Sequence, residues 1–106
     1  MGRGVRWFVL PGVSTTFAGD GAMLLDIKKG TCYRLNLVAT RLWLAIDAHP
    51  EGVLTTEIVD VLGKHFPVAR DVLERDAGAC LDNLLAMSLV RRKRATISSK
   101  AAQGRT

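Results

Sequence analysis

The sequence is poor in the residues that build reactive or cross-linked sites. Its 106 residues include two cysteines, two histidines and three prolines. Cys32 and Cys80 lie 48 positions apart, and neither has a CxxC or cysteine–histidine spacing beside it. Buried free thiols are therefore the expected state of both, and a disulfide is not indicated. The sequence predicts no metal and no cofactor.

Long apolar runs are also missing. The longest uncharged run near the N-terminus, residues 7–19, is interrupted by proline, glycine and hydroxyl residues. A membrane-spanning helix needs roughly 18 to 20 apolar residues, so this run does not qualify. Arg3 and Arg6 precede an apolar stretch that is too short for a signal peptide and lacks a small-residue cleavage site. We therefore expect a cytoplasmic protein with no membrane partner.

No catalytic constellation is present in the sequence. His49 stands before a proline and His65 near the end of an amphipathic stretch, without a cysteine, serine or carboxylate motif beside either. Gly19, Gly21 and Gly30 occupy turn positions and do not form a phosphate-binding loop. Because a single reactive side chain is no evidence of catalysis, the sequence predicts a binding module, not an enzyme.

What the sequence does contain is a balanced composition with segregated charge. Hydrophobic residues make up 48% and charged residues 24%, which is typical of one soluble globular domain. The formal net charge is +5, but residues 91–106 carry +6 and residues 1–10 carry +2, which leaves −3 for residues 11–90. We expect residues 91–106 to be a basic flexible tail, and binding to acidic partners is the alternative.

Three stretches have the pattern of an antiparallel meander. Residues 13–18 alternate in the two-residue period of a half-buried strand, and Asp20-Gly21 then marks a hairpin. A second hairpin follows, with Lys28-Lys29-Gly30 linking residues 22–27 to residues 31–35. The N-terminal segment, residues 1–10, is a candidate for an extra strand beside the first, which would leave residues 31–35 as the open edge.

Three helices are expected after the strands. Asn36 is placed to cap a helix over residues 37–48, and Thr55 to cap a second that ends before Pro67. Asp71 and Glu74 have capping-box spacing at the start of a third helix, which is expected to reach about residue 88. Strands followed by helices indicate an α+β fold, winged-helix-like, with a three-stranded antiparallel sheet followed by three helices over residues 11–90.

The edge strand and the third helix together form the candidate site. An open strand edge can accept another extended chain through backbone hydrogen bonds. Gly78, Ala79 and Cys80 would leave room for the side chains of such a chain; equally, they would let the helix lie close to the sheet. The candidate peptide-binding residues are Thr31, Cys32, Tyr33, Arg34, Leu35, Val72, Asp76, Ala79, Cys80 and Asn83.

Several of these positions belong to a wider pattern. It consists of Leu24-Leu25-Asp26, Gly30, Tyr33, Leu35-Asn36, Ala39 and Trp43, with a later Asp76, Leu81, Leu84 and Leu89-Val90. The pattern resembles the PqqD-like family of small winged-helix domains, which are also called precursor-peptide recognition elements of ribosomally made peptide pathways. The resemblance covers about residues 11–90. Within the family, the Leu-Leu-Asp motif and the Lys-Lys-Gly turn make the sequence most similar to the stand-alone leader-binding protein of lasso-peptide clusters.

The resemblance implies a function. The leader of a precursor peptide would add as a strand beside residues 31–35, antiparallel to them, and would lie against the third helix. The protein would then deliver the precursor to a separate leader peptidase, with a cyclase as a further candidate partner. Service as a peptide chaperone for a radical enzyme, as in pyrroloquinoline quinone biosynthesis, is the alternative within the family.

A DNA-binding winged helix is the alternative from another class, because residues 55–88 also read as a helix-turn-helix. Residues 69–88 contain two arginines and four acidic residues. The helix that would enter the major groove therefore has a net charge of −2. Because DNA affinity depends on cationic contacts with phosphates, this charge weighs against a nucleic-acid partner.

Overall fold

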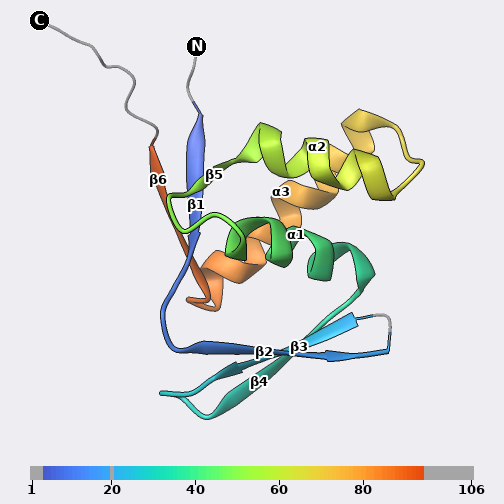
Figure 1. Cartoon of the computed structure of the whole chain (residues 1–106). Helices are drawn as coiled ribbons and strands as arrows, with labels where there is room; N and C mark the ends of the chain where they lie inside the picture. Colours follow the sequence, from blue (N-terminus) through green and yellow to red (C-terminus); the bar gives the residue numbers. More distant parts are fainter. Residues whose placement is uncertain (1–3, 20, 95–106) are drawn as a thin grey trace, which may run out of the picture.

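The computed structural model describes residues 4–19 and 21–94, which form three helices and two three-stranded antiparallel sheets (Figure 1). The elements in chain order are β1 (Val5–Val9), β2 (Val13–Ala18), β3 (Gly21–Asp26), β4 (Thr31–Leu35), α1 (Leu37–Asp47), β5 (Val53–Leu54), α2 (Thr55–His65), α3 (Arg70–Ala86) and β6 (Val90–Arg94). The predicted α+β class is confirmed.

The meander forms the first sheet, in the order β2-β3-β4. Gly30 has a φ of +66°, the left-handed conformation that glycine adopts without strain, and it closes the β3–β4 turn. Leu24 lies opposite Tyr33 and is fully buried, so this face of the sheet contributes to the core. As predicted, β4 is an edge strand.

The helix α1 follows β4 directly and packs on the core face of this sheet. The side chain of Asn36 accepts a hydrogen bond of 2.8 Å from the backbone N–H of Ala39, which confirms the predicted cap. Trp43 is fully buried, and its Nε1 donates to Oγ1 of Thr15 at 3.0 Å. The direct step from strand to helix therefore fixes how β4 sits against the core.

The N-terminal strand does not pair where the sequence suggested. β1 lies in the second sheet, between β5 and β6, and not beside β2. Gly12 turns the chain with a φ of +85°, and the N–H of Leu10 donates to the carbonyl of Leu89 at 3.0 Å. Trp7 is buried and donates from Nε1 to Oγ1 of Thr55 at 2.8 Å. Burial of this indole against α2 therefore holds β1 in the second sheet.

The basic C-terminal segment is not entirely a tail, which corrects the expected boundary at residue 91. β6 pairs with β1 along its whole length, from Val90 opposite Val9 to Arg94 opposite Val5. The guanidinium of Arg91 lies 4.5 Å from the centre of the Phe8 ring. Ladder hydrogen bonds and the stacking of Arg91 on Phe8 stabilise this strand. The strand was not predicted from the sequence because its basic residues are also typical of a solvated tail. Residues 95–106 lie outside the described residues.

The predicted side-chain caps of α2 and α3 were wrong, although both helices begin where they were expected. α2 begins at Thr55 itself, and the Thr55 hydroxyl accepts from Trp7 instead of capping the helix. α3 begins at Arg70 without a side-chain cap, because its N-cap residue is Ala69, which has no acceptor, and Glu74 accepts from the Arg70 side chain. A single hydrophobic core lies between the helices and the two sheets. Its largest fully buried side chains are Trp43, Leu24, Leu42, Ile46, Ile58, Leu62, Leu81, Leu84 and Leu89.

Candidate functional site

The backbone N–H and C=O groups of β4 point alternately toward β3 and toward the open edge of the sheet. The N–H of Ile27, just after β3, donates to the carbonyl of Gly12 on the β2 side. Alternate residues of a strand direct their backbone groups to opposite neighbours, so the even-numbered residues of β3 face β4. Their partners are Thr31, Tyr33 and Leu35. The N–H and C=O of Cys32 and Arg34 therefore point away from β3, toward the free edge.

Side chains of β4 alternate in the same way. Leu35 is buried and Tyr33 packs against the core, whereas Cys32 and Arg34 are exposed on the outer face. An added strand beside β4 would thus meet the backbone of Cys32 and Arg34, and its own side chains would alternate between the outer face and the α3 side.

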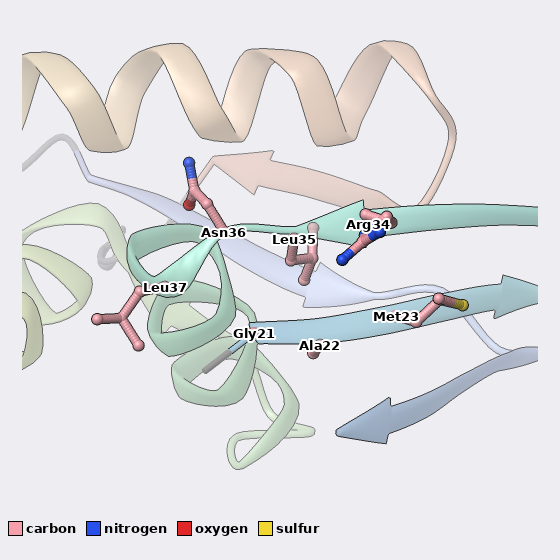
Figure 2. Close-up of a pocket in the computed structure, with 7 residues that line it drawn as sticks. All are labelled: Gly21, Ala22, Met23, Arg34, Leu35, Asn36 and Leu37. Atoms are coloured by element: carbon pink, nitrogen blue, oxygen red, sulfur yellow. The ribbon is translucent and has the colours of Figure 1, made fainter. Parts of the chain in front are cut away.

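A groove of about 390 Å³ runs between β4 and α3. Figure 2 shows α3 on the side of β4 that lies away from β3, so the free backbone groups of β4 face the helix. The groove is lined by Arg34, Leu35, Asn36, Val38, Ala39, Asp76, Ala79, Cys80, Asn83, Leu84 and Met87.

The structure brings together six of the ten predicted site residues in this groove, namely Arg34, Leu35, Asp76, Ala79, Cys80 and Asn83. Thr31, Cys32 and Tyr33 lie on β4 outside the lining, toward the turn. Val72 is on α3, one turn before Asp76, and is also outside the lining. The lining thus takes in the C-terminal end of β4, the start of α1, and α3 from Asp76 onward.

Sequence reasoning missed five lining residues: Asn36, Val38, Ala39, Leu84 and Met87. Met87 continues the series Asp76, Cys80 and Asn83 at helical spacing, so the periodicity contained this signal. Asn36, Val38 and Ala39 carried no such signal, because they line the groove only through the angle at which α1 leaves β4.

The groove walls differ in chemistry. Arg34 of β4 and Asp76 of α3 both belong to the lining, and Ala79 adds a small side chain to the helix wall. Burial raises the pKa of the Cys80 thiol, which keeps this side chain in its neutral form at neutral pH. The lining therefore combines apolar residues with one basic residue, from β4, and one acidic residue, from α3.

One end of the groove is bridged. Nζ of Lys29, in the β3–β4 turn, donates to the carbonyl of Met87 at 3.4 Å and lies 4.0 Å from the carboxylate of Asp26. The backbone N–H of Lys29 also donates to Asp26 at 3.1 Å. These contacts connect the turn before β4 to the C-terminal end of α3.

A second hollow of about 480 Å³ adjoins the same strand (Figure 2). It is lined by Gly21, Ala22 and Met23 of β3 and by Arg34, Leu35, Asn36 and Leu37. The two hollows share Arg34, Leu35 and Asn36, so the end of β4 forms a border between them.

Other kinds of site find no support in residues 4–19 and 21–94. Within these ranges, no group of three or more histidine, cysteine or acidic side chains is placed to hold a metal ion. No helix within them has the length and apolar character needed to cross a membrane.

Comparison with solved structures found close likenesses in fold. One, described as TbiB1 in complex with the TbiA(beta) leader peptide, superposes with a TM-score of 0.69 at 28% identity, covering 79% of this chain and 94% of the other. A second, lasso peptide synthetase B1 complexed with the leader peptide, has a TM-score of 0.68 at 22% identity, covering 81% and 98%. At that lower identity the likeness shows the fold alone.

The comparison with curated protein sequences gave no match. The comparison with protein families gave a match: the family described as coenzyme PQQ synthesis protein D (PqqD) matches residues 21–90. This range runs from the first residue of β3 to the first residue of β6 and includes both walls of the groove. The chain belongs to the PqqD family.

Proposed function

We propose that this protein binds the leader segment of a ribosomally made precursor peptide as an added strand on β4 and presents it to a separate processing enzyme. The observation that carries the proposal is the free edge of β4, where the backbone groups of Cys32 and Arg34 point away from β3, next to the groove that Arg34 lines together with α3. The structural likeness at 28% identity, which is a complex with a leader peptide, supports the same ligand.

Backbone pairing alone does not account for such a complex. Cys32 and Arg34 each offer one N–H and one C=O, and a hydrogen bond contributes about 0.5–1.5 kcal/mol net. These bonds would supply about 2–6 kcal/mol, whereas a micromolar complex needs about 8 kcal/mol after ordering costs are met. The remainder must come from leader side chains that enter the groove beside Ala79 and Cys80.

The pairing direction sets where the peptide leaves. In the proposed antiparallel arrangement, the leader enters beside Leu35 and leaves beside Thr31, next to the β3–β4 turn. The part of the precursor that follows the leader then emerges where Lys29 contacts Met87. We infer that the recipient enzyme, a leader peptidase with a cyclase as a further partner, approaches from this end. The family description names coenzyme PQQ synthesis, and the radical enzyme that the sequence resemblance implies for that pathway is the second candidate recipient.

The first test measures by fluorescence anisotropy the affinity of a fluorescein-labelled leader peptide, taken from a short precursor gene identified in the same genome. Cys32→Pro removes an N–H on the free edge, and at least a tenfold loss of affinity, about 1.4 kcal/mol, is expected. Phe17→Pro is the matched control, because Phe17 is exposed on the opposite edge strand, β2. Equal affinity of the two variants would place the site away from β4.

The second test fills the groove. Ala79→Trp places an indole between the walls and should abolish leader binding, whereas Arg75→Trp, on the exposed side of the same helix, should not. Circular dichroism and melting curves establish that each variant is folded. A folded Ala79→Trp variant with parental affinity would contradict the groove as the binding site.

The native thiols provide an independent footprint. Cys32 is exposed on the edge strand and Cys80 is partly buried in the groove wall. Saturating leader should slow alkylation of Cys80 by iodoacetamide in the Cys32→Ser variant, because the peptide covers the groove. An unchanged alkylation rate in the presence of bound leader would show that the leader lies elsewhere.

A further inference from the structure

The outer face of the second sheet concentrates positive charge. Trp7 faces the core, so its neighbours Arg6 and Phe8 on β1 face outward. Their partners on β6 are Lys93 and Arg91, which share this face. We call these four residues the basic face. Since β1 and β6 contain no carboxylate, no acidic side chain within either strand offsets the charge.

The cations of this face are available for a partner. Arg91 and Lys93 are both exposed. Among the described residues, the ion pairs involve Lys29 and Arg70 and none of the cations of β1 or β6. Nη1 of Arg6 donates to the carbonyl of Gly52 at 3.2 Å, which orders that side chain on the surface. The face thus presents partly ordered cations to solvent.

The basic face also has an apolar anchor point. Arg91 stacks on Phe8, and both border a hollow of about 370 Å³ whose lining includes Pro11, Ile46 and Pro50. Asp47 contributes the carboxylate of that lining. Arginine and aromatic side chains around a small apolar hollow are the composition that protein interfaces favour at their centres.

The basic face lies at the end of the molecule where the proposed leader leaves the groove. Lys29 of the β3–β4 turn contacts Met87, and β6 begins three residues later at Val90. The N–H of Leu10, just after β1, is bonded to Leu89, which joins β1 to the same corner. In Figure 1 the β3–β4 turn, the end of α3 and the start of β6 lie on one side of the molecule.

We propose that the basic face is the docking surface for an acidic surface patch of the enzyme that processes the bound precursor. This inference rests on the proposed function, because the leader's exit places the recipient at this end. Opposite charge would steer the enzyme to the complex, and the Phe8–Arg91 hollow would anchor an apolar side chain. The charge distribution of the chain supports this placement of the docking surface. Residues 11–90 carry a net charge of −3, and the positive charge lies at the two ends of the chain.

The test uses all 106 residues of this protein with a leader peptidase identified in the same genome. Arg91→Glu/Lys93→Glu reverses the basic face, and Lys64→Glu/Arg75→Glu makes the same charge change on exposed parts of α2 and α3. We expect both doubles to bind the labelled leader within about twofold of the parent, because neither touches the groove. Only the first should lower kcat/KM for precursor cleavage, by at least about tenfold.

Two further measurements complete the test. Surface plasmon resonance of the protein on immobilised peptidase, without precursor, reports docking directly, and the parent's affinity should fall as salt rises from about 50 mM to about 300 mM. Lys93→Glu alone leaves the Phe8–Arg91 stack intact and should give an intermediate loss of docking affinity. It replaces the double variant in the test if that variant is unfolded. Arg91→Lys, which retains the charge, should keep most of the docking.

The possible failures are distinct. If the parent does not bind the leader but docks on the peptidase through the basic face, the proposed function fails and the docking surface stands. If both doubles dock and support cleavage equally, the docking proposal is wrong although leader binding stands. Binding of a random-sequence DNA duplex that only the first double loses, with docking on the peptidase unchanged, would overturn the proposal and identify a nucleic-acid surface.

Discussion

Trp43 Nε1 donates a hydrogen bond of 3.0 Å to the hydroxyl of Thr15, and this bond joins α1 to the sheet that carries the edge strand β4. Trp43 is fully buried, so its indole N–H has no access to solvent as an alternative acceptor. The position of β4 therefore depends on a polar contact inside the core as well as on apolar packing.

Thr15→Val should test this contact, because valine keeps the side-chain shape and removes the acceptor. A buried N–H left without a partner costs about 1–3 kcal/mol, so the free energy of unfolding in urea should fall by that amount. Thr16→Val, the same change at an exposed neighbour, should alter it by less than about 0.5 kcal/mol. Similar losses in both variants would show that the Trp43 bond contributes nothing specific.

Gly21→Ala should destabilise the end of β4. A Cβ at position 21 would collide with the carbonyl oxygen of Leu35, and a backbone atom cannot rotate away as a side chain does. Overpacking of this kind costs about 1–3 kcal/mol. Gly78→Ala is the control, since nothing lies near its Cβ position in α3, and it should stabilise the helix by about 0.5–1 kcal/mol. Unfolding curves of the two variants that shift in the same direction would contradict this reading.

Two truncations should separate β6 from the residues beyond it. Removal of residues 95–106 should leave the melting temperature nearly unchanged, because Ile97 is the one large apolar residue among them. Removal of residues 91–106 also deletes the strand paired with β1 and the Arg91 stack on Phe8. It should lower the melting temperature by at least about 5 °C. Equal melting of both truncated proteins would show that β6 does not stabilise the domain.

The Cys80 thiol should respond to pH with a definite sign. Burial raises its pKa, so in the Cys32→Ser variant its alkylation rate should rise at higher pH than that of a small free thiol. Between the unfolded pKa and the raised folded one, the unfolded chain has lost this proton and the folded chain keeps it. The cysteine therefore lowers stability as pH rises through that interval, relative to Cys80→Ala. If the alkylation rate of Cys80 rises at the same pH as that of a free thiol, or at a lower pH, the burial of Cys80 is contradicted.

Local chemistry in the sequence determined the meander and the start of α1. Alternation over residues 13–18, glycine at position 30 and asparagine at position 36 each encode a backbone conformation that needs no distant partner. The helical spacing of Asp76, Cys80 and Asn83 likewise placed them on one face of α3, and that face borders the groove. The strand β4 and most of the α3 wall were predictable for this reason.

Only the tertiary structure decided which distant segments meet. β1 pairs with β6, more than eighty positions away, because Trp7 is buried against Thr55 and Arg91 stacks on Phe8, and no local pattern contains that information. The run Arg91–Arg94 has the composition of a solvated tail, yet ladder hydrogen bonds and aromatic contacts make it a strand. The groove lining at Asn36 and Ala39 likewise depends on the angle between β4 and α1, which core packing sets around Trp43.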